Sequence, residues 1–193
     1  MVEPVAVPWL WVLPIKAISL ETTRKSMLAR VWSKRLIATA RDEMSNVTTT
    51  DIALMREAIA LAAEADAPFG AVIVKDGRVL ARGRNSGKRL KDPTAHGEMV
   101  AIRHCLAEHG PEVLRGATIY TSGEPCPMCM GAIAYCRIAR VVYGASIEEL
   151  SKVLGQIKVP STEIAAKTTF TAIEVTGGVL AEDALKLFDA WSR

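Results

Sequence analysis

The chain has 193 residues, of which half are apolar and 23% are charged, so it can form one globular domain with a sizeable core. Its net charge of +3 is unevenly distributed, because residues 1–41 contain seven basic and two acidic residues whereas the remainder contains 17 and 19. A slightly acidic body lacks the clustered Lys and Arg with which proteins bind a phosphate backbone, which argues against a nucleic-acid-binding protein.

The first 43 residues differ from the rest in composition. Residues 4–15 are apolar but contain three prolines, so they are too short and too broken for a membrane span or a good signal peptide. Residues 18–41 are rich in Arg and hydroxyl residues, as organelle transit peptides are. We expect residues 1–43 to be an extension, either disordered or an upstream in-frame start before Met44, with a targeting peptide or a docked helix as alternatives. Residues 44–193 then form the folded domain.

The domain is predicted to begin with a helix over residues 48–65, capped by Asp51 or Thr50. Residues 70–83 contain two short β-branched runs around the Asp-Gly pair at positions 76 and 77, which predicts a β-hairpin. A polar loop follows over residues 85–94, and residues 96–110 are predicted to form a helix that ends at a Gly-Pro pair.

The second half alternates strands and helices. We expect strands over residues 117–122, 140–145 and 168–175, and helices over 128–138, 147–154 and 180–191. Crossover-length connections between strands favour a largely parallel sheet, covered by helices on both faces, with an antiparallel edge from the hairpin. The fold class expected from this pattern is therefore α/β.

The four cysteines are too few for a disulfide framework at this length, which indicates reduced thiols in a cytosol-like compartment. Two of them, Cys126 and Cys129, form a CxxC pair at a predicted helix start, and His96 opens another helix. One imidazole and two thiolates are the three protein ligands that zinc uses when it keeps a fourth position for water. Cys105 and Cys136 lie further along their helices, so an open zinc site is preferred to a closed structural one.

Glu98 lies two residues after His96, where a carboxylate can reach the pocket without binding the metal and can transfer protons there. Taken alone, a CxxC pair can be a redox dithiol, and a single His is more often a packed or solvated residue. Taken together, the His-x-Glu and Pro-Cys-x-x-Cys segments form the signature of zinc deaminases.

The segments PFGAVIVKDG, DPTAHGEMVAIR and IYTSGEPCPMCMGAI resemble the cytidine deaminase superfamily, and most closely bacterial guanine deaminases. The resemblance implies a three-layer α/β/α fold with a five-stranded mixed sheet, a homodimer, and one zinc per chain in a deaminase domain over residues 44–193. It implies that His96, Cys126 and Cys129 bind zinc and that Glu98 is the proton shuttle. It also implies that Asn85, the backbone NH of Gly97 and Phe69 contact the substrate.

Two positions depart from the family pattern: Gly97 stands where Ala is usual, and Gly123 stands where guanine deaminases typically have Cys. The expected activity is hydrolytic deamination of a nucleobase, guanine to xanthine and ammonia, in the cytoplasm and without a membrane. Three alternatives remain. They are a deaminase of cytosine, a nucleoside or another amino-heterocycle; a tRNA adenosine deaminase, for which the last strand and helix also show a resemblance; and a non-catalytic zinc-binding module.

Overall fold

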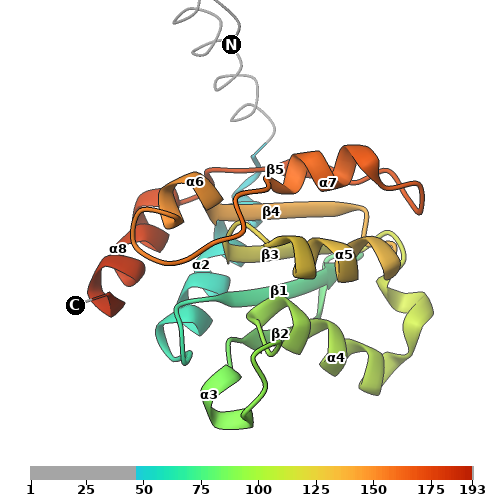
Figure 1. The fold of residues 1–193 in the computed structure, drawn as a ribbon. Helices are drawn as coiled ribbons and strands as arrows, with labels where there is room; N and C mark the ends of the chain where they lie inside the picture. The colour runs from blue at the N-terminus through green and yellow to red at the C-terminus, as the bar shows by residue number, and fades with distance from the viewer. Residues whose placement is uncertain (1–46, 193) are drawn as a thin grey trace, which may run out of the picture. The chain divides into compact units, whose positions relative to one another are not determined.

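The computed structural model describes residues 47–192 (Figure 1), so the expected extension over residues 1–43 lies outside the described residues. Within that range the strands are β1 (Gly70–Lys75), β2 (Arg78–Arg84), β3 (Thr118–Gly123), β4 (Arg140–Ala145) and β5 (Glu174–Thr176). The helices are α2 (Thr49–Ala63), α3 (Gly87–Leu90), α4 (Gly97–His109), the 3-10 helix η1 (Pro111–Leu114), α5 (Pro127–Tyr135), α6 (Ile147–Leu150), α7 (Ser161–Lys167) and α8 (Ala181–Trp191). None of these helices is both long enough and apolar enough to cross a lipid bilayer.

The strands form one five-stranded sheet in the order β2-β1-β3-β4-β5. Strand β1 is antiparallel to both β2 and β3, whereas β3, β4 and β5 run parallel. The expected five-stranded mixed sheet is therefore confirmed. Only β1 runs opposite to the other four strands, so the sheet is largely parallel in direction as expected, but antiparallel pairing extends past the hairpin to the contact between β1 and β3.

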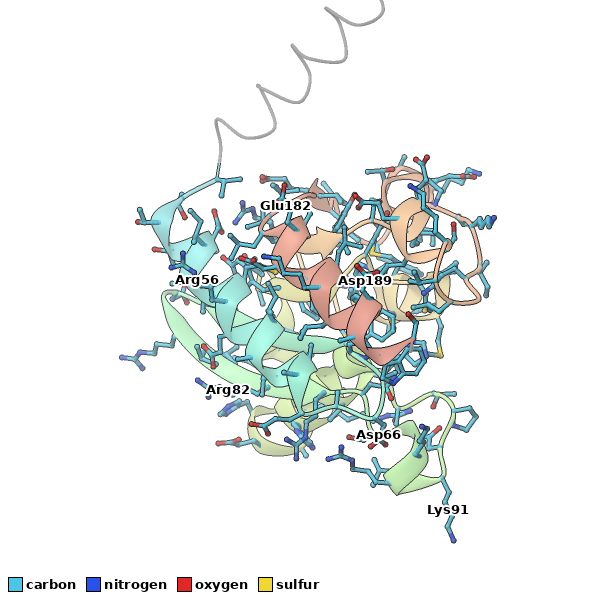
Figure 2. The ribbon with its side chains drawn as sticks, turned by 90° about the vertical axis from the view of Figure 1, so that its left-hand side faces the viewer. Arg56, Asp66, Arg82, Lys91, Glu182 and Asp189 are labelled. Atoms are coloured by element: carbon cyan, nitrogen blue, oxygen red, sulfur yellow. The ribbon has the colours of Figure 1, made fainter. Side chains whose placement is uncertain are left out.

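Helices cover both faces of the sheet, as the α/β/α expectation required (Figure 1). Alternate strand residues point to opposite faces: Ile73 packs in a cluster with residues of α4 and α5, whereas Val72 packs in a cluster with residues of α2. Figure 2 shows α2 and α8 side by side on this second face. The core is thus divided by the sheet, with α4 and α5 on one side and α2 and α8 on the other.

Local sequence accounts for the best-predicted elements. In the hairpin, Asp76 and Gly77 both have positive φ, +50° and +74°, which is the conformation that favours an Asp-Gly pair between two strands. Helix α2 starts at Thr49, within the expected range but before both proposed cap residues. Thr48 caps it, and Asp51 is the third helical residue of a capping box with Thr48, so the proposed caps Asp51 and Thr50 were wrong.

Asp51 also joins α2 to the sheet. Its buried carboxylate accepts hydrogen bonds from the hydroxyl of Tyr120 at 2.7 Å and from Nη1 of Arg140 at 2.6 Å. Burial alone raises the pKa of Asp51, but hydrogen bonds from Arg140, Thr48 and Tyr120 outweigh it and hold this pKa well below its usual range. The ionised carboxylate is therefore the stable form of this contact.

Several elements differ from expectation, including η1, which was not expected, and α6, which ends before residue 154. The polar loop over residues 85–94 contains α3, the helix α7 was not expected, and β5 covers only the last part of the strand expected over residues 168–175. Helices α3 and α7 have only four and seven residues, too few for a clear hydrophobic period. Strand β5 has three residues and is defined by its pairing with β4, which local sequence does not encode.

Candidate zinc site

The candidate metal ligands lie at the starts of two neighbouring helices. His96 is the N-cap residue of α4, Cys126 is the N-cap residue of α5, and both have extended backbone conformations. Pro127 occupies the first position of α5, where a missing NH costs nothing because first-turn NH groups have no helical partner. The expectation that helix starts deliver these residues is confirmed.

Three ligand atoms from separate parts of the chain converge here. The Sγ atoms of Cys126 and Cys129 are 3.7 Å apart, and the Nδ1 atom of His96 lies 3.7 Å from the first and 3.6 Å from the second. Among the residues that the structure describes, this is the only group of three or more His, Cys, Asp or Glu side chains arranged to hold a metal ion.

The spacing of these atoms tests whether zinc fits. With Zn–S of about 2.3 Å and Zn–N of about 2.0 Å in tetrahedral geometry, the sulfurs should be about 3.8 Å apart and each sulfur about 3.5 Å from the nitrogen. The observed separations of 3.6–3.7 Å agree with both values. The three residues therefore fit a zinc ion and leave its fourth position free of protein ligands.

The charge state of the thiols favours metal binding. The pKa of Cys126 is lowered to about 4 by hydrogen bonding with Cys129 and His96 against the effect of burial, whereas contact with Cys126 and burial raise the pKa of Cys129. Free NH groups at the helix start stabilise a thiolate in the same position. The lowered pKa of Cys126 thus favours the thiolate form that zinc binds.

Glu98 lies in the first turn of α4 and is only 3% exposed. Burial raises the pKa of its carboxyl to about 7, and the charges of Cys126 and His96 also act on it. The side chain is therefore close to the ligands, although it is not a member of the group that can hold the metal. A buried carboxyl beside a metal site, outside the ligand set, is suited to proton transfer.

Of the three residues expected to contact substrate, Phe69 and Gly97 border His96, and Asn85 is joined to Phe69 by a backbone hydrogen bond. Asn85 follows β2, its Oδ1 accepts a hydrogen bond from the NH of Gly87 at 3.2 Å, and its backbone NH donates to the carbonyl of Phe69 at 2.8 Å. Gly97 is the first residue of α4. The ring of Phe69 lies parallel to the imidazole of His96, with ring centroids 6.2 Å apart.

Two residues at this site were missed from the sequence. Phe188 on α8 is fully buried and packs edge-on against Phe69. Glu124, two residues before Cys126, is 5% exposed and accepts hydrogen bonds from the NH groups of Ile147 and Ser161, each at 2.7 Å. The sequence could have indicated Glu124 through its place in the Glu-Pro-Cys segment. For Phe188 the only signal was that it belongs to the apolar stripe of α8, which predicts burial but not contact with this site.

Comparison with known proteins shows which family this chain resembles. A family model described as the cytidine and deoxycytidylate deaminase zinc-binding region matches residues 48–145. The guanine deaminase of Bacillus subtilis (strain 168) is 46% identical over 96 residues, which is 47% of this chain and 62% of the relative. The tRNA-specific adenosine deaminase of Streptococcus pyogenes serotype M1 is 33% identical over 139 residues, which is 72% of this chain and 79% of the relative.

A solved structure described as work on A-to-I editing by tRNA:A34 deaminases superposes with a TM-score of 0.61 at 34% identity. The match covers 69% of this chain and 97% of that one. The chain spans 29%, 62% and 53% of the length of the first three curated relatives that it matches. Relatives that act on a free base and relatives that act on tRNA are thus both similar to this chain.

Proposed function

The chain belongs to the cytidine and deoxycytidylate deaminase family, and from this membership and the geometry of its site we propose that it hydrolytically deaminates a free nucleobase, guanine, to xanthine and ammonia. The observation that carries the proposal is the triangle of His96, Cys126 and Cys129, whose separations fit zinc. Beside it lies Glu98, a buried carboxyl that is not a ligand. A purely structural zinc site has no use for such a carboxyl, which argues against the non-catalytic alternative.

Zinc bound by these three residues supplies Lewis acidity that makes a water molecule nucleophilic at neutral pH. The carboxylate of Glu98 accepts a proton from the attacking water. The oxygen of this water forms a bond to the amino-bearing carbon of the base. The same carboxyl then delivers the proton to the leaving nitrogen, and ammonia departs. Because Glu98 is buried, its carboxyl is shielded from bulk water during both transfers.

In this proposal, residues around the metal orient the substrate. The side-chain amide of Asn85 donates and accepts hydrogen bonds at the base edge, and the backbone NH of Gly97 donates to the ring. Asn85 is 9% exposed and is tied through its backbone to Phe69, so its side chain is held in one place. The ring of Phe69 supplies an apolar wall.

The charge of the segment from β2 to α3, residues 82–91, favours a free base over tRNA as the substrate. A tRNA substrate needs an unpaired basic surface near the site, and five basic residues lie between positions 82 and 91. Three of them are paired with acids: Arg82 with Glu57, Arg84 with Glu64, and Arg89 with Asp66. Figure 2 shows Lys91 extending outward from this segment. The segment thus offers far less positive charge than its composition suggests.

We also propose a homodimer in a cytosol-like compartment. The exposed rings of Tyr135 on α5 and Phe170 contact each other with their planes tilted by 38° and their centroids 4.6 Å apart, and 74% and 47% of their residue surfaces are exposed. An exposed aromatic pair of this kind fits the apolar interface of a second copy. The free thiols of all four cysteines fit a reducing compartment.

Ammonia release from the full-length protein, measured over guanine, adenine, cytosine, their nucleosides and purified tRNA, tests the proposal. We expect release from guanine well above that from every other substrate, and release from guanine lower by roughly 10² to 10⁴ with Glu98→Gln. Inosine formation in tRNA without turnover of free bases would replace this proposal with the tRNA adenosine deaminase alternative. Turnover of cytosine or a nucleoside alone would change the substrate but retain the mechanism.

A further inference from the structure

Phe69 is held in place from several directions. It immediately precedes β1, and its ring is tilted by only 6° from the imidazole of His96. A parallel ring at this distance is within the range of favourable aromatic pairs and restricts rotation of the imidazole out of that plane. The orientation of one zinc ligand therefore depends on where Phe69 sits.

Gly97 and Gly123, the two positions at which the sequence departs from the family pattern, both border Phe69. A Cβ atom on Gly97 would lie 2.8 Å from the carbonyl oxygen of Phe69, and a Cβ atom on Gly123 would lie 2.9 Å from Cε1 of its ring. Side chains at these positions would displace the Phe69 backbone in one case and its ring in the other. Both glycines thus form part of the space that Phe69 occupies.

The C-terminal helix closes this space. The ring of Phe188 meets that of Phe69 edge-on, with centroids 4.9 Å apart and planes at 68°. Three residues further on, Nε1 of Trp191 donates a hydrogen bond to the carbonyl of Asp66 at 3.2 Å. In Figure 2, Asp66 lies close to the C-terminal end of α8. Helix α8 therefore contacts the segment that carries Phe69 at two points.

We propose that Phe188 is a positioning residue for the zinc site: it fixes the ring of Phe69, which in turn holds the imidazole of His96 in its metal-binding orientation. Phe188 lies beyond residues 48–145, the part that matches the family model. The zinc site of this chain therefore extends to its last helix. The inference rests on the metal site of the proposed function but not on the identity of the substrate.

The test compares zinc retention in the full-length wild-type protein, Phe188→Leu and Phe188→Ala. Zinc release to a chromophoric chelator should be faster by on the order of tenfold in Phe188→Ala, the lower end of the effect of residues that orient metal ligands. Phe188→Leu retains an apolar side chain for folding and should show a smaller change in the same direction. The visible spectrum of the cobalt-substituted protein should shift in both variants, and kcat should fall with little change in KM.

Met55→Ala is the matched control, because Met55 is also fully buried but belongs to a different hydrophobic cluster. It should lower thermal stability without changing zinc release or the cobalt spectrum. The double variant Phe69→Leu/Phe188→Ala tests whether Phe188 acts on the zinc site through Phe69. If it does, the double variant should release zinc no faster than Phe69→Leu alone.

Zinc release at the wild-type rate in both Phe188 variants, or a change equal to that of Met55→Ala, would overturn the inference. Additive effects in the double variant would also overturn it, because Phe188 would then act independently of Phe69. These outcomes are separate from failure of the proposed function, since a protein that deaminates none of the tested bases can still be measured for zinc release.

Discussion

The Nδ1 atom of His96 lies 3.6 Å from the Sγ atom of Cys129, although 33 residues separate them in the chain. This approach results from two helices that start at neighbouring positions, and it brings together one nitrogen and two sulfurs at the spacing that zinc requires.

Glu98→Gln should remain folded and zinc-loaded but lose activity by roughly 10² to 10⁴, the usual contribution of general acid and base catalysis. The amide keeps the shape of the buried side chain but cannot accept the proton of the attacking water. Ammonia release and metal analysis on the same preparation check both parts. Near-normal turnover with full zinc content would exclude the proton-transfer role.

Asn85→Ala should lower kcat/KM by about fivefold or more, because an orienting hydrogen bond contributes on the order of 1 kcal/mol. Ser86→Ala is the control, since the hydroxyl of Ser86 makes a comparable local hydrogen bond to the carbonyl of Arg84 at 3.0 Å. Steady-state kinetics with guanine should separate the two variants. Equal losses in both would show that the loop, rather than the Asn85 side chain, is what matters.

Gly97→Ala should destabilise the protein by about 1–2 kcal/mol, because overpacking against the Phe69 carbonyl costs more than the gain in helix propensity. Gly87→Ala is the matched control: Gly87 is the first residue of α3 as Gly97 is of α4, and its added Cβ would make only ordinary contacts. Urea unfolding measures both free energies. A stabilised Gly97→Ala protein would show that Phe69 has room to move.

Asp51→Asn should destabilise the fold by about 3 kcal/mol, because it leaves the partly buried Arg140 without its carboxylate. The pKa of Asp51 is lowered in the folded state, so the folded protein binds the proton less readily than the unfolded chain. Its contribution is therefore complete above the unfolded pKa of about 3.9 and is lost as the pH falls below that value.

Unfolding free energies measured between pH 7 and pH 3 check the Asp51 prediction. The wild type should lose stability as the pH falls below about 4, and the Asp51→Asn profile should be flatter in this range. Asp183→Asn is the control, since Asp183 pairs with Lys186 at the surface and should leave the profile nearly unchanged. Parallel profiles for the wild type and Asp51→Asn would contradict the assignment.

The parts of the molecule that could be predicted from sequence are those encoded locally. The Asp76-Gly77 turn and the two helix starts follow from residue types at short spacing, and the prediction of a zinc site rests on two such short segments, His-x-Glu and Cys-x-x-Cys. The contact between Phe69 and Phe188 could not be predicted, because it joins distant segments across a core in which any large apolar residue satisfies the pattern. The pairing of Arg82, Arg84 and Arg89 with acids was missed for the same reason, since composition counts charges but not their partners.

The account depends above all on one zinc ion held by His96, Cys126 and Cys129. Elemental analysis of the purified full-length protein tests this most directly, with Cys126→Ser as the ligand variant and Cys136→Ser as a cysteine control outside the metal-binding group. The account predicts one zinc per chain in the wild type and Cys136→Ser, and little or none in Cys126→Ser. A wild-type protein without a transition metal, or equal zinc in all three proteins, would contradict it.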